Sequence, residues 1–143
     1  MTKLLKYSFV LIVFFSSSSL SKENFFDEAK MLYEEGKLGE SKFLFQRNIV
    51  FNPKDSNSYL YLAKIYEAEA NEQEEEKNIN TTLLLDSSNE DAMYMLIDMK
   101  LKKSDYKKVE DLTEKFQIIC SLLCNKIDSI KERLTNIEAK DES

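Results

Sequence analysis

Apolar residues recur at helical spacing in the last third of the chain, where polar residues separate them. One set, at i, i+3, i+7 and i+10, consists of Val109, Leu112, Phe116 and Ile119. A second set, between Asn125 and Ala139, consists of Ile127, Ile130, Leu134 and Ile137. Such spacing places each set on one face of an α-helix. Charges of mixed sign surround the second set, which predicts a helix with one buried side and one solvent-exposed side.

The apolar pattern recurs every 34 residues along the chain. The positions of core type that align are Ala29, Ala63 and Ile97; Phe25, Tyr59, Met93 and Ile127; and Phe51, Leu85 and Ile119. The aligned positions of turn type are Gly36, Ala70 and Ser104, and also Pro53, Ser87 and Ser121. Asp55 aligns with Asn89, and both residue types can cap a helix. A period of this length indicates similar structural units stacked around one continuous core.

The repeat resembles that of the tetratricopeptide-repeat (TPR) family, whose units are about 34 residues long. The units are residues 22–55, 56–89 and 90–123, followed by a capping helix and tail at 124–143. The first unit carries the family pattern as Phe25, Ala29, Leu32, Gly36, Phe45 and Pro53. The later units carry it as Tyr59, Leu62, Ala63 and Tyr66, and as Met93, Leu96, Ile97, Tyr106 and Phe116. The resemblance implies an all-α, right-handed solenoid of about three helix–turn–helix units plus the capping helix.

Two positions depart from the family pattern. Its small residue in the second helix is represented by Ser41, Glu75 and Val109. A glutamate fits poorly at a tight helix crossing, and Lys100 replaces a large apolar residue in the third unit.

Asn71 followed by Glu74 resembles a capping box, which predicts a helix start at this point. The acidic run from Glu72 to Glu76 would then lie at the positive end of a helix dipole.

The amino-terminal residues have the pattern of an export signal. Lys3 and Lys6 form a short basic start, and Tyr7–Phe15 is apolar apart from one serine. Ser19-Leu20-Ser21 then fits a small-x-small cleavage site. The apolar run is about half of the ~20 residues that a bilayer-spanning helix requires. We therefore expect a cleaved signal peptide at residues 1–21 and a periplasmic, exported protein. The alternative is an uncleaved anchor in the inner membrane, with the chain facing the periplasm.

The mature chain, defined as residues 22–143, is acidic. Loss of residues 1–21 removes two of the 20 basic residues and none of the 26 acidic residues, which gives 18 − 26 = −8. This charge argues against nucleic acid or anionic membrane as a partner, because both attract cationic surfaces. The chain has no histidine and only two glycines, so it lacks the commonest general base and a glycine-rich phosphate loop. We expect a non-enzymatic protein without a cofactor, metal or small-molecule substrate.

Cys120 and Cys124 flank the turn between the third unit and the final helix. Cysteines of exported proteins tend to pair, because the compartment is oxidising. On a continuous helix four residues rise about 6 Å, which is within the Cα separations that a disulfide accepts. One hypothesis is a disulfide that fixes the angle of the capping helix; the alternative is two small buried hydrophobic residues. The spacing and the lack of histidine disfavour a redox motif or a zinc site.

The resemblance implies that the first helix of each unit lines a concave groove for a partner. The family's groove positions correspond to Phe26, Lys30, Tyr33, Asn57, Leu60, Lys64, Glu67, Asp91, Tyr94, Asp98 and Leu101. Aromatic residues mixed with single charges suit an extended peptide or a helix of a partner protein. Phe26 and Lys30 replace residues that some members use to clamp a terminal carboxylate, so that specificity is not expected. Changing Tyr33 and Leu60 to alanine is expected to weaken partner capture without unfolding the protein.

The predicted function is that of an adaptor of the bacterial envelope that holds part of another protein in this groove. A second hypothesis is a structural subunit of a larger or self-associating complex. It would be favoured by an incomplete cap at the amino end, around Phe25 and Phe26. A third is a membrane-anchored scaffold that retains residues 1–21, and only in that case is contact with a membrane expected.

Overall fold

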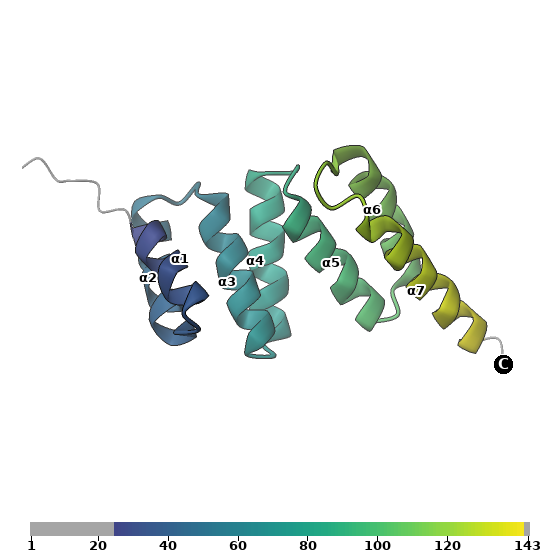
Figure 1. Ribbon diagram of the computed structural model, residues 1–143, viewed down its shortest axis with the longest axis horizontal. Coiled ribbons are helices and arrows are strands. Elements are labelled where there is room, and N and C mark those ends of the chain that lie inside the picture. Colours follow the sequence, from purple (N-terminus) through teal and green to yellow (C-terminus); the bar gives the residue numbers. More distant parts are fainter. Residues whose placement is uncertain (1–24, 142–143) are drawn as a thin grey trace, which may run out of the picture.

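The chain forms a row of helix pairs (Figure 1). The computed structural model describes residues 25–141, and this range contains seven α-helices and no strand. They are α1 (Phe25–Glu34), α2 (Leu38–Phe51), α3 (Ser56–Ala68), α4 (Glu72–Leu85), α5 (Glu90–Lys102), α6 (Tyr106–Ile119) and α7 (Lys126–Asp141). The predicted signal peptide lies outside the described residues. None of the helices between residues 25 and 141 combines the length and apolar character needed to cross a bilayer.

The three units of the repeat each contain one pair of helices. The pairs α1–α2, α3–α4 and α5–α6 lie within residues 22–55, 56–89 and 90–123. Each helix packs mainly on its neighbours in sequence, and α7 packs on both α5 and α6. Figure 1 shows the pairs side by side, with α1 and α2 at one end of the row and α7 at the other. The architecture is therefore an all-α solenoid, as predicted.

Each helix pair is closed by a turn with one residue in the left-handed backbone region. The φ angles are 77° at Gly36, 53° at Ala70 and 57° at Ser104. The amide of Gly36 donates to the carbonyl oxygen of Tyr33 at 3.0 Å, and the next amide donates to the carbonyl oxygen of Leu32 at 2.9 Å. The same two hydrogen bonds recur in the turns at Ala70 and Ser104. This closure is the Schellman motif, which favours glycine because glycine has no Cβ. The aligned turn positions are thus confirmed.

The buried residues of the core occupy the small and apolar positions that recur in each unit. Ala29, Ala63 and Ile97 are each 0% exposed, so the first helices pack closely against their neighbours. Phe45 in α2 and Phe116 in α6 are also fully buried. One buried cluster joins α1, α2 and α3, and a larger cluster extends from α3 to α7. Both clusters contain residues of α3, so buried apolar side chains extend from α1 to α7 through that helix.

The helix starts are capped at two of the expected positions. The side-chain oxygens of Asn71 and Asn89 accept hydrogen bonds from backbone amides three residues later, at 3.3 and 3.0 Å. Asp55 aligns with Asn89 but makes no such bond. Its carboxylate instead accepts from the Asn48 amide at 2.8 Å and the Ser58 hydroxyl at 2.6 Å. Asn48 and Ser58 are buried, so their donors need an acceptor. An unsatisfied buried donor lowers stability more than a missing cap does, which explains why Asp55 accepts from these two side chains instead of capping α3.

Lys100 and Glu75, the two charged residues that depart from the repeat pattern, have different surroundings. Lys100 pairs with Glu76 across α4 and α5, and Lys103 donates to the same carboxylate at 3.1 Å. These hydrogen bonds hold the pKa of Glu76 below its ordinary value. Glu75 is only 6% exposed and borders a hollow of about 210 Å³ at the ends of α3, α4 and α5. Burial, together with the nearby charge of Glu67, raises the pKa of Glu75.

The first prediction concerns the strained turn at Ala70. Ala70→Gly should raise the free energy of unfolding by about 1 kcal/mol, because glycine adopts a positive φ without a steric penalty. Ala68→Gly is the matched control, since Ala68 is exposed in the last turn of α3. That control should lower stability by up to about 1 kcal/mol. Urea unfolding of both variants tests this, and a lower midpoint for Ala70→Gly would contradict it.

The second prediction concerns Glu75. Its folded pKa lies above the ordinary value of 4.5, so its ionisation opposes folding as the pH rises through the folded pKa. Glu75→Gln should therefore raise the thermal midpoint at pH 7, and the gain should shrink below about pH 4.5, where both states carry a protonated carboxyl group. Thermal melts from pH 3 to 8 measure this. A gain that does not depend on pH would contradict the electrostatic cause.

Candidate functional site

A hollow of about 350 Å³ lies across the first helices of the three units. Its lining comes from α1, α3 and α5 and consists of Tyr33, Lys64, Glu67, Asp91, Tyr94 and Met95. Five of these six residues are among the predicted groove positions. The stacking of the units therefore brings together side chains that are far apart in sequence, from Tyr33 to Tyr94. A concave site with a few aromatic and charged side chains is suited to hold part of another molecule.

An ion pair in the lining of this hollow joins the second and third units. The ammonium nitrogen of Lys64 lies 2.5 Å from a carboxylate oxygen of Asp91. The same nitrogen is 5.5 Å from the centre of the Tyr61 ring, within cation–π range. Both charged side chains remain partly exposed, so they keep contact with solvent. The pair fixes the position of two opposite charges beside the hollow, where a partner's polar groups can reach them.

Aromatic side chains pack against one another on the α1 side of the hollow. The Tyr33 and Tyr61 ring centres are 5.1 Å apart with an edge-to-face geometry, and Phe26 meets Tyr61 in the same way at 5.8 Å. Tyr61 also stacks on the buried Phe45 ring at 5.0 Å. Rings packed in this manner lose little further freedom when a ligand binds. Tyr61 was not among the predicted groove residues, although it lies three residues before Lys64 and so on the same helical face.

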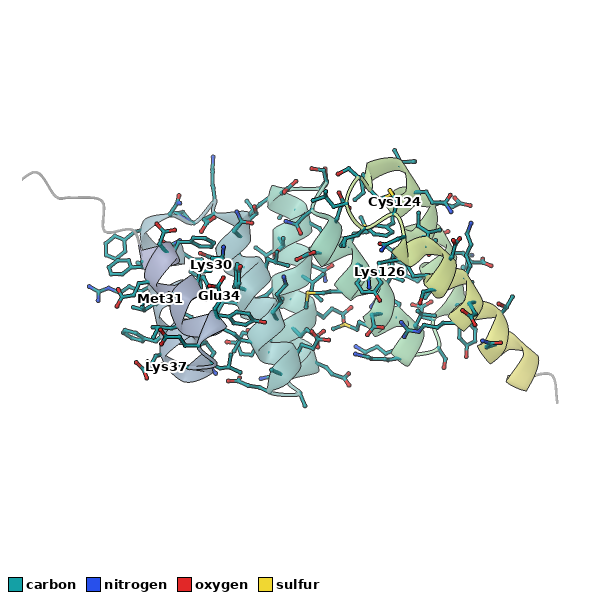
Figure 2. The ribbon with its side chains drawn as sticks, viewed as in Figure 1. Lys30, Met31, Glu34, Lys37, Cys124 and Lys126 are labelled. Atoms are coloured by element: carbon teal, nitrogen blue, oxygen red, sulfur yellow. A yellow bond between two sulfur atoms is a disulfide. The ribbon has the colours of Figure 1, made fainter. Side chains whose placement is uncertain are left out.

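The capping helix contacts two of the predicted groove residues on α5, Asp98 and Tyr94. Arg133 of α7 pairs with Asp98 of α5 at 2.6 Å, and Lys102 pairs with the same carboxylate at 2.8 Å. Burial opposes the ionisation of Asp98, but hydrogen bonds from Lys102 and Arg133 hold its pKa below the ordinary value. Lys126, labelled on α7 in Figure 2, places its ammonium group 5.7 Å from the centre of the Tyr94 ring. Asp98 therefore ties α7 to the stack.

The remaining predicted groove residues are divided between surface and core. Lys30 is exposed and pairs with Glu34 at 3.8 Å, and Asn57 is exposed near the start of α3 (Figure 2 labels Lys30 and Glu34). Leu60 and Leu101 are only 6% and 3% exposed and belong to the larger buried cluster. Their assignment to the groove surface is wrong, because they point between helices rather than toward solvent. The expected tolerance of alanine at Leu60 is withdrawn for the same reason.

The loop between α6 and α7 carries both cysteines. The structure joins Cys120 and Cys124 in a disulfide, with their Cα atoms 5.2 Å apart. The hypothesis assumed a continuous helix, but α6 ends at Ile119 and residues 121–125 form a loop. Cys120 has extended backbone angles, which turns the chain toward α7. Oxidation in the exported protein remains a prediction, and its structural effect would be to brace this loop.

Glu90 at the start of α5 holds the same loop by hydrogen bonds. Its carboxylate accepts from the hydroxyl of Ser121 at 2.7 Å and from the backbone amides of Ser121, Leu122 and Leu123 at 2.8, 3.0 and 2.7 Å. These donors, of which the Ser121 hydroxyl has the largest effect, lower the pKa of Glu90 to about 2. Sequence reasoning missed this residue, because its partners lie far along the chain and no local pattern marks them.

The comparisons with known proteins show the fold. No protein-family model matches the sequence, and no curated protein sequence matches it. The type III secretion chaperone SycD of Yersinia enterocolitica, in complex with a peptide of the translocator YopD, superposes with a TM-score of 0.69 at 17% identity. The match covers 83% of this chain and 93% of that one.

Two further solved structures are similar. The second TPR domain of human RPAP3, in complex with the HSP70 peptide SGPTIEEVD, has a TM-score of 0.63 at 19% identity and covers 78% of this chain and 90% of its own. The Sgt2 TPR domain from Aspergillus fumigatus has a TM-score of 0.63 at 16% identity, over 87% of this chain and 81% of its own. At these identities the likeness shows that the fold is a TPR solenoid.

The third prediction concerns Glu90 and the loop that it holds. Its folded pKa of about 2 lies below the ordinary value of 4.5, so its contribution to stability is present above pH 4.5 and is lost as the pH falls toward 2. The amide resonances of residues 121–123 should therefore titrate near pH 2 in NMR spectra, and Glu90→Gln should abolish this step. Glu114→Gln, at an exposed glutamate of α6, is the control. A transition near pH 4.5 in the wild type would contradict the assignment.

Proposed function

We propose that this protein is a non-enzymatic adaptor that holds a peptide or a helix of a partner protein in the groove across α1, α3 and α5. The observation that carries the proposal is the hollow of about 350 Å³, whose lining joins Tyr33, the Lys64–Asp91 pair and Tyr94. Aromatic side chains with fixed polar neighbours are common anchors at protein interfaces. Among residues 25–141 no group of three potential metal-ligating side chains is arranged to hold an ion.

The lining suits an extended backbone with at least one apolar side chain. Tyr33 and Tyr94 offer apolar ring surface on the α1 and α5 sides of the hollow, and Met95 adds an adaptable contact. Lys64 and Asp91 provide a donor and an acceptor between them, which matches the alternating polar groups of a peptide backbone. Because the two charges largely compensate each other, a partner does not need strong net charge to bind.

Two of the similar structures support a peptide as the ligand class. The SycD structure contains a peptide of the translocator YopD, and the RPAP3 domain contains an HSP70 peptide. Both share the TPR architecture with this chain, with TM-scores of 0.69 and 0.63. The TPR architecture is therefore compatible with binding a peptide of another protein.

The proposed location is the bacterial periplasm, after cleavage of residues 1–21. The support is the sequence pattern of Lys3, Lys6 and the apolar run that follows, together with the small residues before Lys22. A disulfide between Cys120 and Cys124 would persist in that oxidising compartment. The partner would then be a protein of the envelope or one that passes through it.

The fourth prediction tests the groove. The mature chain, residues 22–143, should capture one or more envelope proteins from an extract, and peptides from them should bind in solution. Tyr33→Ala should weaken that binding about tenfold, or about 1.4 kcal/mol, because it removes an aromatic anchor. Fluorescence anisotropy with the labelled peptide measures the change.

The control is another tyrosine outside the hollow. Tyr59 lies on α3, and its hydroxyl donates to the carbonyl oxygen of Pro53 at 3.3 Å. Tyr59→Ala should leave the affinity unchanged. Thermal melts of both variants separate lost binding from lost folding. Equal affinity of the Tyr33 variant and the wild type, with both folded, would contradict the groove as the binding site.

A further inference from the structure

The outer side of the first helix pair exposes large apolar side chains. Met31 is 52% exposed, Phe43 62% and Val50 75%. A hollow of about 360 Å³ lies between α1 and α2 on this side and is lined by Glu28, Leu32, Gly39, Glu40, Phe43 and Leu44. Figure 2 shows Met31 on the side of α1 that faces away from α3, at the end of the row. We call this surface, formed by the outer side of α1 and α2, the end face.

The repeat itself shows that one of these residues occupies a packing position. Met31 corresponds to Ile65 and Met99 in the aligned units, and those two residues are 0% and 3% exposed. In the second and third units this position packs against the preceding pair, whereas in the first unit no described pair precedes it. At the opposite end α7 packs on α5 and α6 and buries Ile130 to 1% exposure. Met31 thus occupies a packing position that has no neighbour among the described residues, whereas Val50 corresponds to Leu84 and Ile118, which are exposed in the other units as well.

Phe43 indicates that the end face is adapted to a partner. The corresponding residues of the other units are Lys77 and Asp111, which are exposed charged residues on their second helices. Only the first unit carries an aromatic residue there. An exposed aromatic on a terminal unit, where internal units carry charge, favours an interaction surface over a residual core position.

The charge pattern of α2 identifies the occupant. Its outer side carries Glu40, Phe43, Arg47 and Val50 at i, i+3, i+7 and i+10. If two copies of α2 pack antiparallel about a twofold axis, Glu40 of each copy lies beside Arg47 of the other, and the two Phe43 rings meet near the axis. Arg47 also lies over the Phe25 ring at 4.3 Å, and its five N–H donors allow it to keep that contact while it meets a carboxylate. The surface is complementary to itself.

We propose that the end face is a self-association surface, on which a second copy of this chain packs its own α1 and α2 about a twofold axis. Each α2 is about 21 Å long, and two neighbouring helices span about 20 Å, so the contact is at the low end of specific interfaces. A contact of this size is typical of a transient dimer. The groove across α1, α3 and α5 stays open in each copy, so the dimer presents two grooves and binds a bivalent partner with increased avidity.

Sedimentation velocity of the mature chain from about 2 to 300 µM tests the proposal, because this range brackets a micromolar dissociation constant. The wild type should convert from monomer to dimer over this range, and Phe43→Glu should weaken dimerisation at least tenfold. Leu84→Glu is the matched control, because Leu84 is 83% exposed on α4, outside the end face. A wild type that stays monomeric at the highest concentration would overturn the proposal, as would equal loss of dimer in the Leu84 variant.

A charge-swap experiment tests the twofold geometry. Glu40→Arg alone and Arg47→Glu alone should each be monomeric, because each places like charges opposite one another in a homodimer. A mixture of the two variants should dimerise, since every contact then pairs opposite charges. Thermal melts establish that both variants are folded. A mixture no more dimeric than its components would overturn the antiparallel arrangement, and neither outcome affects the groove, because Tyr33 and Tyr94 lie elsewhere.

Discussion

The burial of each helix pair against the next is the interaction on which the rest of this structure depends. A pair such as α3–α4 has apolar residues on two sides, so it can exclude water only between two neighbours. Ile65 and Met99 lose nearly all their exposure through this stacking. The turns at Gly36, Ala70 and Ser104 make the stacking possible, because each reverses the chain with the same backbone geometry. Ala70 and Ser104 have positive φ angles although neither is glycine, so these two turns have the same geometry as the turn at Gly36 at a cost in backbone strain.

The same stacking creates the candidate binding groove. The stacking places α1, α3 and α5 so that Tyr33, Lys64 and Tyr94 line one hollow. Side chains on their common face then meet across unit boundaries, as Lys64 and Asp91 do. Tyr61 packs between Phe45 and Tyr33 and connects the core to the groove. A ligand would therefore meet a surface whose side chains are already held in place, which reduces the entropy lost on binding.

The two ends of the solenoid differ in how they are completed. At the carboxyl end, Glu90 accepts hydrogen bonds from the loop that precedes α7, Asp98 pairs with Arg133 on that helix, and Ile130 of α7 is buried. At the amino end, the described residues begin at α1, and Met31 occupies a packing position that is exposed. The carboxyl end is thus covered by α7 through both apolar and polar contacts, whereas Met31 at the other end is exposed.

The sequence by itself determined the helical class, the length of the repeat unit and most of the core. These features are encoded locally, since apolar spacing, turn residues and capping residues such as Asn71 and Asn89 act within one or two helical turns. It also identified Tyr33, Lys64 and Tyr94 as neighbours, because the repeat fixes which positions share a face. Only the tertiary structure decided that Leu60 and Leu101 are buried, that Tyr61 supports the groove and that Glu90 holds a loop distant from it in the sequence. These outcomes depend on how far one helix is rotated against the next, and that rotation is set by packing between units rather than by any local pattern.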